Sequence, residues 1–231
     1  MRSDYKPLTA LIEGFKFREP TADGLANERT CLPIPTEKPN CFERIPQIKS
    51  ANLADLLKIR QSTTRYSTEK INIRPILSIF QDSLLEDRKR WINAGPELEG
   101  FLFAINPNDS PKGIYRVSYN TIDYIREFPE NTNIEDLTVQ KEFAHAGAIL
   151  SIATNLDLAD TFAGSHGYRL AMVRSANAIY KTHLNCFGLG LVGTVFAGFI
   201  PAAVRKLLYS DGVTRHQMFA ATVGKPFQIN P

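Results

Sequence analysis

Residues 166–199 read HGYRLAMVRSANAIYKTHLNCFGLGLVGTVFAGF. A stripe of side chains recurs there at spacings of three and four, which predicts one long, mostly buried amphipathic helix; its members are Leu170, Val173, Asn177, Tyr180, Leu184 and Phe187. Gly188 and Gly190 end this helix, because the position after a helix favours a residue that tolerates positive φ. A short apolar strand or loop then runs to Phe199. The stretch is either a core helix closed by a glycine cap, or a unit that presents backbone N–H groups to a flat, electron-rich ligand.

The overall composition is that of an ordinary soluble domain. Of the 231 residues, 43% are hydrophobic and 22% are charged, so the chain can bury a full core. A net charge of +3, dispersed along the chain, argues against a nucleic-acid partner. Glycine and proline interrupt the longest apolar runs, which argues against a membrane span.

Three cysteines, at positions 31, 41 and 186, have no close spacing that would suggest a disulfide framework or a zinc site. The first residues, MRSDYKPLTA, lack the apolar core of a secretory signal. We therefore expect a reduced cytoplasmic protein without a metal.

The chain divides into two parts by composition. Residues 1–49 are rich in proline, with LPIPTEKPNCFERIP as the clearest example, and we expect an extended arm with one short helix near 9–15. This arm either crosses onto a partner subunit or is a plain leader. Residues 50–231 form the domain proper.

The domain begins with a helix that leads into a cluster of cations and hydroxyls. In SANLADLLKIRQS, Ser50 is the expected N-cap, and the helix runs into Arg60-Gln61-Ser62. Arginine and hydroxyl groups at this spacing suit a phosphate, since the guanidinium forms paired charge-assisted hydrogen bonds. The alternative is a polar helix end whose arginines offset the helix dipole.

The remaining segments predict an α+β sandwich in which a central, mostly antiparallel sheet is flanked by helices. The expected helices are 71–90, 131–143, the long helix above and 201–211, and the expected strands are 100–106, 114–118, 119–128, 147–156 and 217–223.

With these pieces placed, residues 50–226 resemble the nitroreductase-like flavoproteins, and within them the SagB-type dehydrogenases, which include the microcin-type azoline dehydrogenases. The resemblance rests on Arg60-Gln61-Ser62, on GFLFAINPNDSPKGIYRVS, on Gly167-Tyr168-Arg169, on Gly190-Leu191 and Val195–Phe199, and on AVRKLL and VGKP. It implies a nitroreductase-like fold with a long dimer-interface helix, a homodimer, and FMN as cofactor. It also implies an enzyme that dehydrogenates azoline rings to azoles in a peptide substrate, alongside a cyclodehydratase partner.

Carried over by position, the resemblance assigns the cofactor contacts. Arg60, Gln61 and Ser62 lie at the FMN phosphate, and Lys225 is a second phosphate contact. Ala197 and Gly198 present backbone N–H groups toward the flavin N5 region. Asn93 stands about where the family has a polar contact to the ring, although its loop departs from the family spacing by about two residues.

The sequence departs from the azoline dehydrogenases where they carry a catalytic Lys-Tyr pair. Phe162 and Ala163 occupy those positions, and Tyr180-Lys181 replaces a Gln-Asn pair in the long helix. His166, Tyr180 and Lys181 are the candidate catalytic replacements, and histidine suits a general base near neutral pH. Three functions stay open: an azoline dehydrogenase, a related flavin reductase or oxidase acting on another small molecule, and a flavin-fold scaffold subunit without chemistry.

Overall fold

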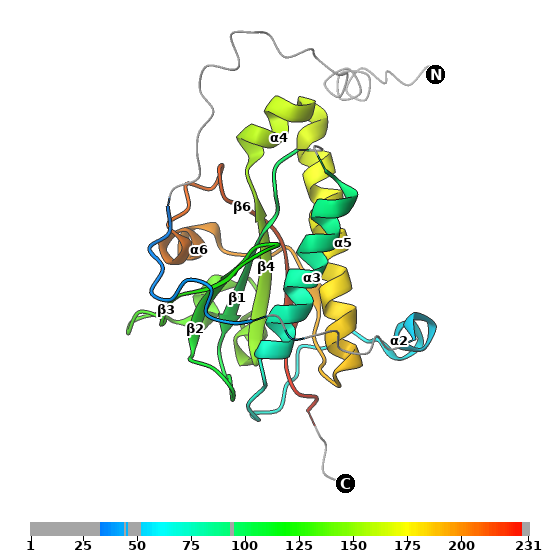
Figure 1. The fold of residues 1–231 in the computed structure, drawn as a ribbon. Coiled ribbons are helices and arrows are strands. Elements are labelled where there is room, and N and C mark those ends of the chain that lie inside the picture. The colour runs from blue at the N-terminus through cyan, green and yellow to red at the C-terminus, as the bar shows by residue number, and fades with distance from the viewer. Residues whose placement is uncertain (1–32, 44, 46–51, 93–94, 228–231) are drawn as a thin grey trace, which may run out of the picture.

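The computed structural model describes residues 33–43, 45, 52–92 and 95–227. Within these ranges an antiparallel six-stranded sheet has the order β3-β2-β1-β4-β6-β5, and helices pack on both of its faces (Figure 1). The strands are β1 Glu99–Ala104, β2 Gly113–Val117, β3 Ile122–Arg126, β4 Ala148–Thr154, β5 Val195–Phe196 and β6 His216–Val223. The α-helices are α2 Leu53–Ile59, α3 Arg74–Arg90, α4 Leu156–Ala163, α5 Ser165–Gly188 and α6 Pro201–Leu208. The predicted α+β fold class is confirmed.

The core lies on both sides of the central strand β4, every residue of which is buried. Alternate side chains of a strand point to opposite faces, so β4 contributes to two apolar clusters. Leu150 and Ile152 pack under α3 and α5, whereas Ile149 and Ala153 pack under α6. Because both faces are covered, β4 does not alternate between apolar and polar residues, and its polar residues Ser151 and Thr154 are buried as well.

Helix α5 is the predicted long helix, but its orientation differs from the expectation. The buried face consists largely of small residues such as Ala171, Ser175 and Ala178, which allow close packing on the sheet and on α3. In the predicted stripe, Val173 is 52% exposed and Tyr180 is 37% exposed. The middle of that stripe therefore faces outward, and only its C-terminal part, such as Leu184, is buried.

Residues 33–43 run along β3, at one edge of the sheet. Lys38 exchanges backbone hydrogen bonds with Tyr124, and Cys41 N–H donates to the Ile122 carbonyl at 2.8 Å. An uncovered edge strand presents unpaired backbone groups, and this segment pairs with them. The part of the predicted arm that the structure describes thus adds to the sheet, while the helix expected at 9–15 lies outside the described residues.

Three secondary-structure predictions were wrong. Residues 131–143 form two 3₁₀ turns, η2 Ile134–Leu137 and η3 Lys141–His145, instead of one helix. Between them Thr138 is extended and pairs with Phe199, and Val139 N–H donates to the Gly198 carbonyl. Helix α4 was not predicted, and Asn155 caps it by accepting a hydrogen bond from the Leu158 N–H at 3.0 Å.

The third wrong prediction concerns the cap of α2. Asn52, not Ser50, is the N-cap, since its side chain accepts from the Ala54 N–H at 2.9 Å. Ser50 lies outside the described residues.

Candidate flavin site

The candidate phosphate clamp begins where α2 ends. Arg60 caps α2 with an extended backbone conformation (φ −62°, ψ 121°), so the chain leaves the helix axis there. Ser62 then pairs in parallel with Gly193, and Thr63 N–H donates to the Gly193 carbonyl at 3.1 Å. The Arg60 guanidinium lies 3.4 Å from the Ser62 hydroxyl oxygen. The clamp is therefore attached to the loop that precedes β5, more than 130 residues further along the chain.

The C-terminal end of β6 lies against the same loop that pairs with Ser62. Val192 and Gly224 exchange two backbone hydrogen bonds of 2.9 Å, and Ser67 N–H donates to the Lys225 carbonyl at 3.0 Å. Beneath these bonds, the buried Tyr66 hydroxyl contacts Thr222 Oγ1 at 2.6 Å. Three distant segments thus bring Lys225 beside the segment that carries the clamp.

The charges of this cluster suit an anion. Arg60 and Lys225 are both half-buried, and among the described residues neither forms an ion pair with a carboxylate. Ser62 adds a neutral hydroxyl donor. A guanidinium, an ammonium and a hydroxyl without an acidic neighbour form a donor set that fits a phosphate group.

His183 adds a buried polar group near the clamp. Its side chain is fully buried in α5, and neither ring nitrogen has a hydrogen-bond partner in the described part of the chain. Burial, together with the nearby Arg60 charge, lowers the pKa of His183 to about 4, so the ring is neutral at pH 7. The sequence contained His183 inside the helical stripe but gave no signal that it would lie near Arg60.

The loop after β5 is positioned by backbone bonds on both sides. Val195 pairs with Ala221 of β6, and the Gly198 carbonyl accepts from Val139 N–H at 2.9 Å. Ala197 between them is exposed. At a strand rise of about 3.3 Å per residue, Ala197 lies roughly 13 Å from Gly193 and hence from the clamp. The clamp and the loop therefore lie along one extended segment at the edge of the sheet.

Comparison with solved structures identifies this architecture. No protein-family model matches the sequence, and no curated protein matches it. A structure assigned as a nitroreductase from Anabaena variabilis superposes with a TM-score of 0.63 and 19% identity over 76% of this chain, and the chain spans only 39% of that protein's length. The E. coli microcin synthetase McbBCD complex with truncated pro-MccB17 bound contains a chain with a TM-score of 0.55 and 13% identity, over 98% of this chain and 95% of that one. A structure assigned as a nitroreductase in complex with FMN, from Exiguobacterium sibiricum, gives a TM-score of 0.51 and 9% identity over 79% of this chain and 94% of that one.

The chain has the nitroreductase-like fold. Its six-stranded antiparallel sheet and long α5 helix match the architecture expected from the sequence. At these identities the similarity establishes the fold alone. The described part of the chain contains no cluster of three metal-ligating side chains and no helix long and apolar enough to span a membrane.

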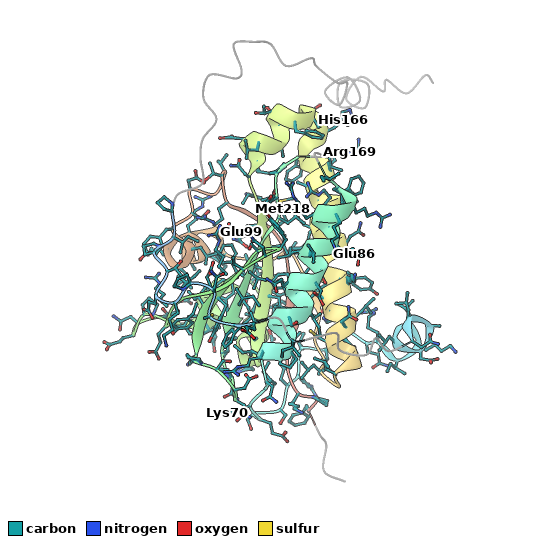
Figure 2. The ribbon with its side chains drawn as sticks, viewed as in Figure 1. Lys70, Glu86, Glu99, His166, Arg169 and Met218 are labelled. Atoms are coloured by element: carbon teal, nitrogen blue, oxygen red, sulfur yellow. The ribbon has the colours of Figure 1, made fainter. Side chains whose placement is uncertain are left out.

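Within the nitroreductase-like fold, the three catalytic candidates do not come together in one chain. His166 lies at one end of α5, as Figure 2 shows, whereas His183 near the clamp is 17 residues further along. At 1.5 Å per residue this separation is about 26 Å. Tyr180 and Lys181 are within one turn of His183, at the clamp end. Along α5, Tyr180 and Lys181 therefore lie nearer to His183 and the clamp than His166 does, while the Lys181 side chain is directed to α3.

The side chain of Lys181 is already engaged. It forms an ion pair with Glu86 of α3, labelled in Figure 2, and burial lowers the pKa of its ammonium group. The ion pair with Glu86 favours the protonated ammonium and so opposes this effect of burial. Tyr180 is partly exposed on the outward face of α5.

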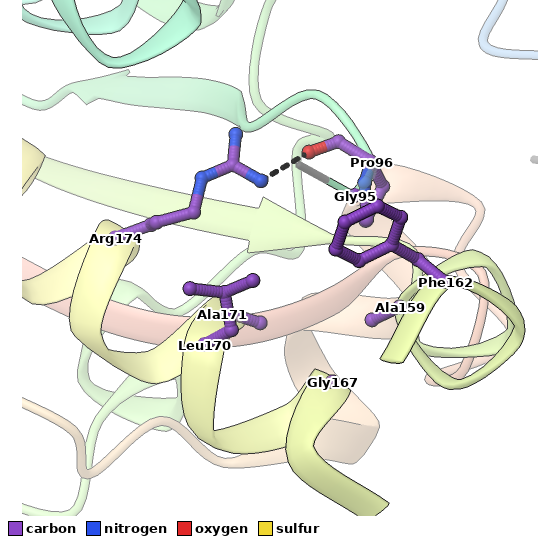
Figure 3. Close-up of a pocket in the computed structure, with 8 residues that line it drawn as sticks. All are labelled: Gly95, Pro96, Ala159, Phe162, Gly167, Leu170, Ala171 and Arg174. Atoms are coloured by element: carbon purple, nitrogen blue, oxygen red, sulfur yellow. Dashed lines mark hydrogen bonds between the residues drawn. The ribbon is translucent and has the colours of Figure 1, made fainter. Parts of the chain in front are cut away.

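Phe162 and Ala163 lie at the end of α4, against the loop before β1. Figure 3 shows the Phe162 ring beside Gly95 and Pro96, with Arg174 donating to the Pro96 carbonyl at 2.9 Å. The gap between these residues is too small to hold a water molecule. Phe162 is 44% exposed and carries no group that can accept a proton. The predicted loss of the catalytic pair therefore leaves an apolar contact in its place.

Two further cofactor predictions concern residues that offer little structural information. Gln61 is exposed beside the clamp. Asn93 lies outside the described residues. Gly167, in the Gly-Tyr-Arg motif, has a packing role: a Cβ there would lie 2.0 Å from the Ala159 carbonyl oxygen, so only glycine lets α4 and α5 approach this closely.

Proposed function

We propose that the chain binds FMN, with the phosphate held by Arg60, Ser62 and Lys225. The observation that carries this proposal is the convergence of three distant segments on these side chains, through the bonds of Gly193 and Gly224. His183 is buried near Arg60 and has no hydrogen-bond partner among the described residues, so it is a further polar group that a bound ligand would satisfy. Gln61 and Asn93 remain proposed contacts from the sequence.

The loop of Ala197 and Gly198 would face the ring system. Its backbone N–H groups lie at the edge of the sheet, roughly 13 Å beyond the clamp along the strand. Backbone donors held rigidly at this position stabilise negative charge that develops on a ligand. FMN, when bound, supplies a hydride acceptor, and molecular oxygen reoxidises it.

We propose that the protein is an oxidoreductase that dehydrogenates azoline rings to azoles in a peptide. The ring loses a proton from its α-carbon and a hydride from its β-carbon, so the protein must supply a base as well as orientation. Lys181, Tyr180 and His166 are the proposed candidates for this base. Support comes from the match to a chain of the McbBCD complex along almost the whole sequence. A cyclodehydratase is then the expected partner.

A homodimer would complete the site. Val173 and Tyr180, seven residues apart, form an exposed apolar stripe on α5, Tyr168 is exposed nearer the start of that helix, and Leu53 and Leu57 are exposed on α2. Apolar stripes of this kind are typical of a surface that another subunit covers. Sedimentation at low micromolar concentration should show a dimer, and a flavin-loaded monomer would contradict this proposal.

The first experiment is the absorbance spectrum of the purified protein. FMN should give bands at about 370 and 450 nm. Arg60→Ala should lose the bound FMN, because the phosphate loses its main charge partner. Arg65→Ala is the matched control, since Arg65 is an exposed arginine five residues away on the same segment. A yellow Arg60→Ala protein at wild-type stoichiometry would refute the proposed phosphate site.

A second candidate function follows from Phe162. Its apolar contact with the Gly95 loop favours a flavin reductase acting on another small molecule, or a scaffold subunit of a cyclodehydratase assembly, since neither needs the Lys-Tyr pair. Anaerobic mixing separates the candidates. An azoline peptide bleaches the flavin of an azoline dehydrogenase, whereas a reduced nicotinamide alone bleaches that of a reductase. A protein that stays colourless and does not take up FMN is the scaffold.

A further inference from the structure

A separate pocket lies between α6, the 197–199 loop and the first residues of β6. It encloses about 230 Å³. Ala197, Phe199 and Val204 form an apolar wall, and the Phe199 ring is fixed by contacts with Phe103 and Phe196. A cavity of about 150 Å³ accommodates benzene, so this pocket has room for one aromatic ring with a substituent.

The opposite wall carries a positive charge. Arg205 is exposed at the rim, and in the described part of the chain no carboxylate pairs with it. Its guanidinium folds over Gly212, where an added Cβ would lie 2.6 Å from Nε. Arg215, deeper in the wall, is already bound by Glu99 at 2.6 Å. Arg205 is therefore the cation that an anionic ligand would meet.

Asp211, the acidic residue nearest to Arg205 in the sequence, does not neutralise the Arg205 guanidinium. Asp211 Oδ1 accepts hydrogen bonds from the backbone N–H groups of Val213 and Thr214, both at 2.8 Å. Oδ2 accepts from the Thr214 hydroxyl at 3.0 Å. The carboxylate of Asp211 is thus occupied by its own turn.

Two polar side chains at the start of β6 add hydrogen-bonding capacity. His216 Nδ1–H donates to the Gly212 carbonyl oxygen at 2.9 Å, so Nε2 of this tautomer is an acceptor for a donor group on the ligand and not a contact for its carboxylate. The amide oxygen and nitrogen of Gln217 are buried and have no hydrogen-bond partner in the described part of the chain. An amide in this state gains by turning toward a polar group bound in the adjacent pocket.

The pocket is distinct from the phosphate clamp. Gln217 and Lys225 are eight residues apart at opposite ends of β6, a separation of roughly 26 Å. An apolar wall, one unpaired cation and adjacent hydrogen-bonding groups together match one ligand chemistry. We propose that this pocket binds a small aromatic carboxylate, with the ring against Phe199 and the carboxylate on Arg205. The pocket shares Ala197 with the loop that is proposed to face the flavin ring.

The test is a ¹⁹F NMR titration of 4-fluorobenzoate against the full chain, with 4-fluorobenzamide as the uncharged analogue. The carboxylate should bind saturably and at least tenfold more tightly than the amide, because only the carboxylate forms a charge-assisted contact. Arg205→Gln should weaken binding by at least tenfold, Arg205→Lys should retain most of it, and Gln217→Leu should weaken it by about threefold.

Lys206→Gln is the matched control, because Lys206 is the exposed neighbour on α6 and does not line the pocket. Its affinity should equal that of the wild type. The proposal is overturned if the carboxylate does not bind saturably, if the amide binds equally well, or if Arg205→Gln binds like the wild type. A thermal melt of each variant establishes that it is folded.

Discussion

Ser62 and Gly193 lie side by side in a parallel bridge, although 131 residues separate them in the sequence (193 minus 62). This bridge holds the end of α2 against the loop that leads into β5. The same loop is bonded to Gly224 through Val192. One short segment therefore positions Ser62 and Lys225, the two ends of the proposed phosphate clamp.

Gly193→Ala should disrupt the clamp. An added Cβ would lie 1.9 Å from the Thr222 carbonyl oxygen, so the backbone must move. We expect a loss of about 1–3 kcal/mol in the free energy of unfolding, measured with urea, and at least tenfold weaker FMN binding. Gly198→Ala is the control for stability alone, because its nearest neighbour atom would be 3.6 Å away and Gly198 is itself a proposed flavin contact. Equal stability of the two variants would contradict the role given to Gly193.

The buried ion pair between Arg174 and Asp87 joins α5 to α3. Arg174 Nη2 lies 2.7 Å from Asp87 Oδ2, and Nε lies 3.2 Å from Oδ1, with both side chains buried. Arg174→Met should cost about 3–5 kcal/mol of unfolding free energy, because it leaves the Asp87 carboxylate buried without its cation.

The double variant Arg174→Met with Asp87→Leu tests whether the loss of stability comes from the unpaired buried charge or from the altered packing. Replacing both charges by apolar groups should recover most of the loss, because no buried charge remains. Thermal or urea unfolding of the two single variants and the double variant measures this coupling. A double variant as unstable as the sum of the single variants would show that the charges themselves are not the cause.

His183 should make the stability depend on pH. Its pKa is about 4 in the folded chain and 6.5 ordinarily, so unfolding takes up a proton between pH 4 and 6.5. The contribution of His183 is fully present above pH 6.5 and decreases as the pH falls, by up to about 3 kcal/mol at pH 4. Urea unfolding from pH 4 to 7 should show this slope in the wild type and a smaller slope in His183→Leu. The same pH dependence in the wild type and in His183→Leu would refute this role of His183.

Gly167→Ala tests the packing of α4 on α5. The added methyl group would lie 2.0 Å from the Ala159 carbonyl oxygen, so the two helices must separate. We expect the melting temperature to fall by several degrees, corresponding to about 1–3 kcal/mol. Ser165→Ala, at an exposed position two residues earlier, should change it little. Similar melting temperatures for both variants would contradict this role.

Much of the fold could be predicted from local patterns in the sequence. Short apolar runs located the core strands, and spacings of three and four located the long helix, although the middle of that stripe faces outward. Glycine and proline residues marked several of the helix and strand ends. These patterns were insufficient at residues 131–143, where long-range pairing of Thr138 and Val139 with the 198–199 backbone overrides the helical preference.

The sequence by itself determined the α+β class, the strands, the long helix and the chemical types at Arg60, Ser62 and Lys225. Only the tertiary structure decided which residues meet, because those contacts join segments far apart in the chain. It brought Lys225 beside the clamp segment through Gly193 and Gly224, placed His183 near Arg60, and turned Val173 and Tyr180 outward. It also separated His166 from the clamp by the length of α5, since a rigid helix fixes that distance.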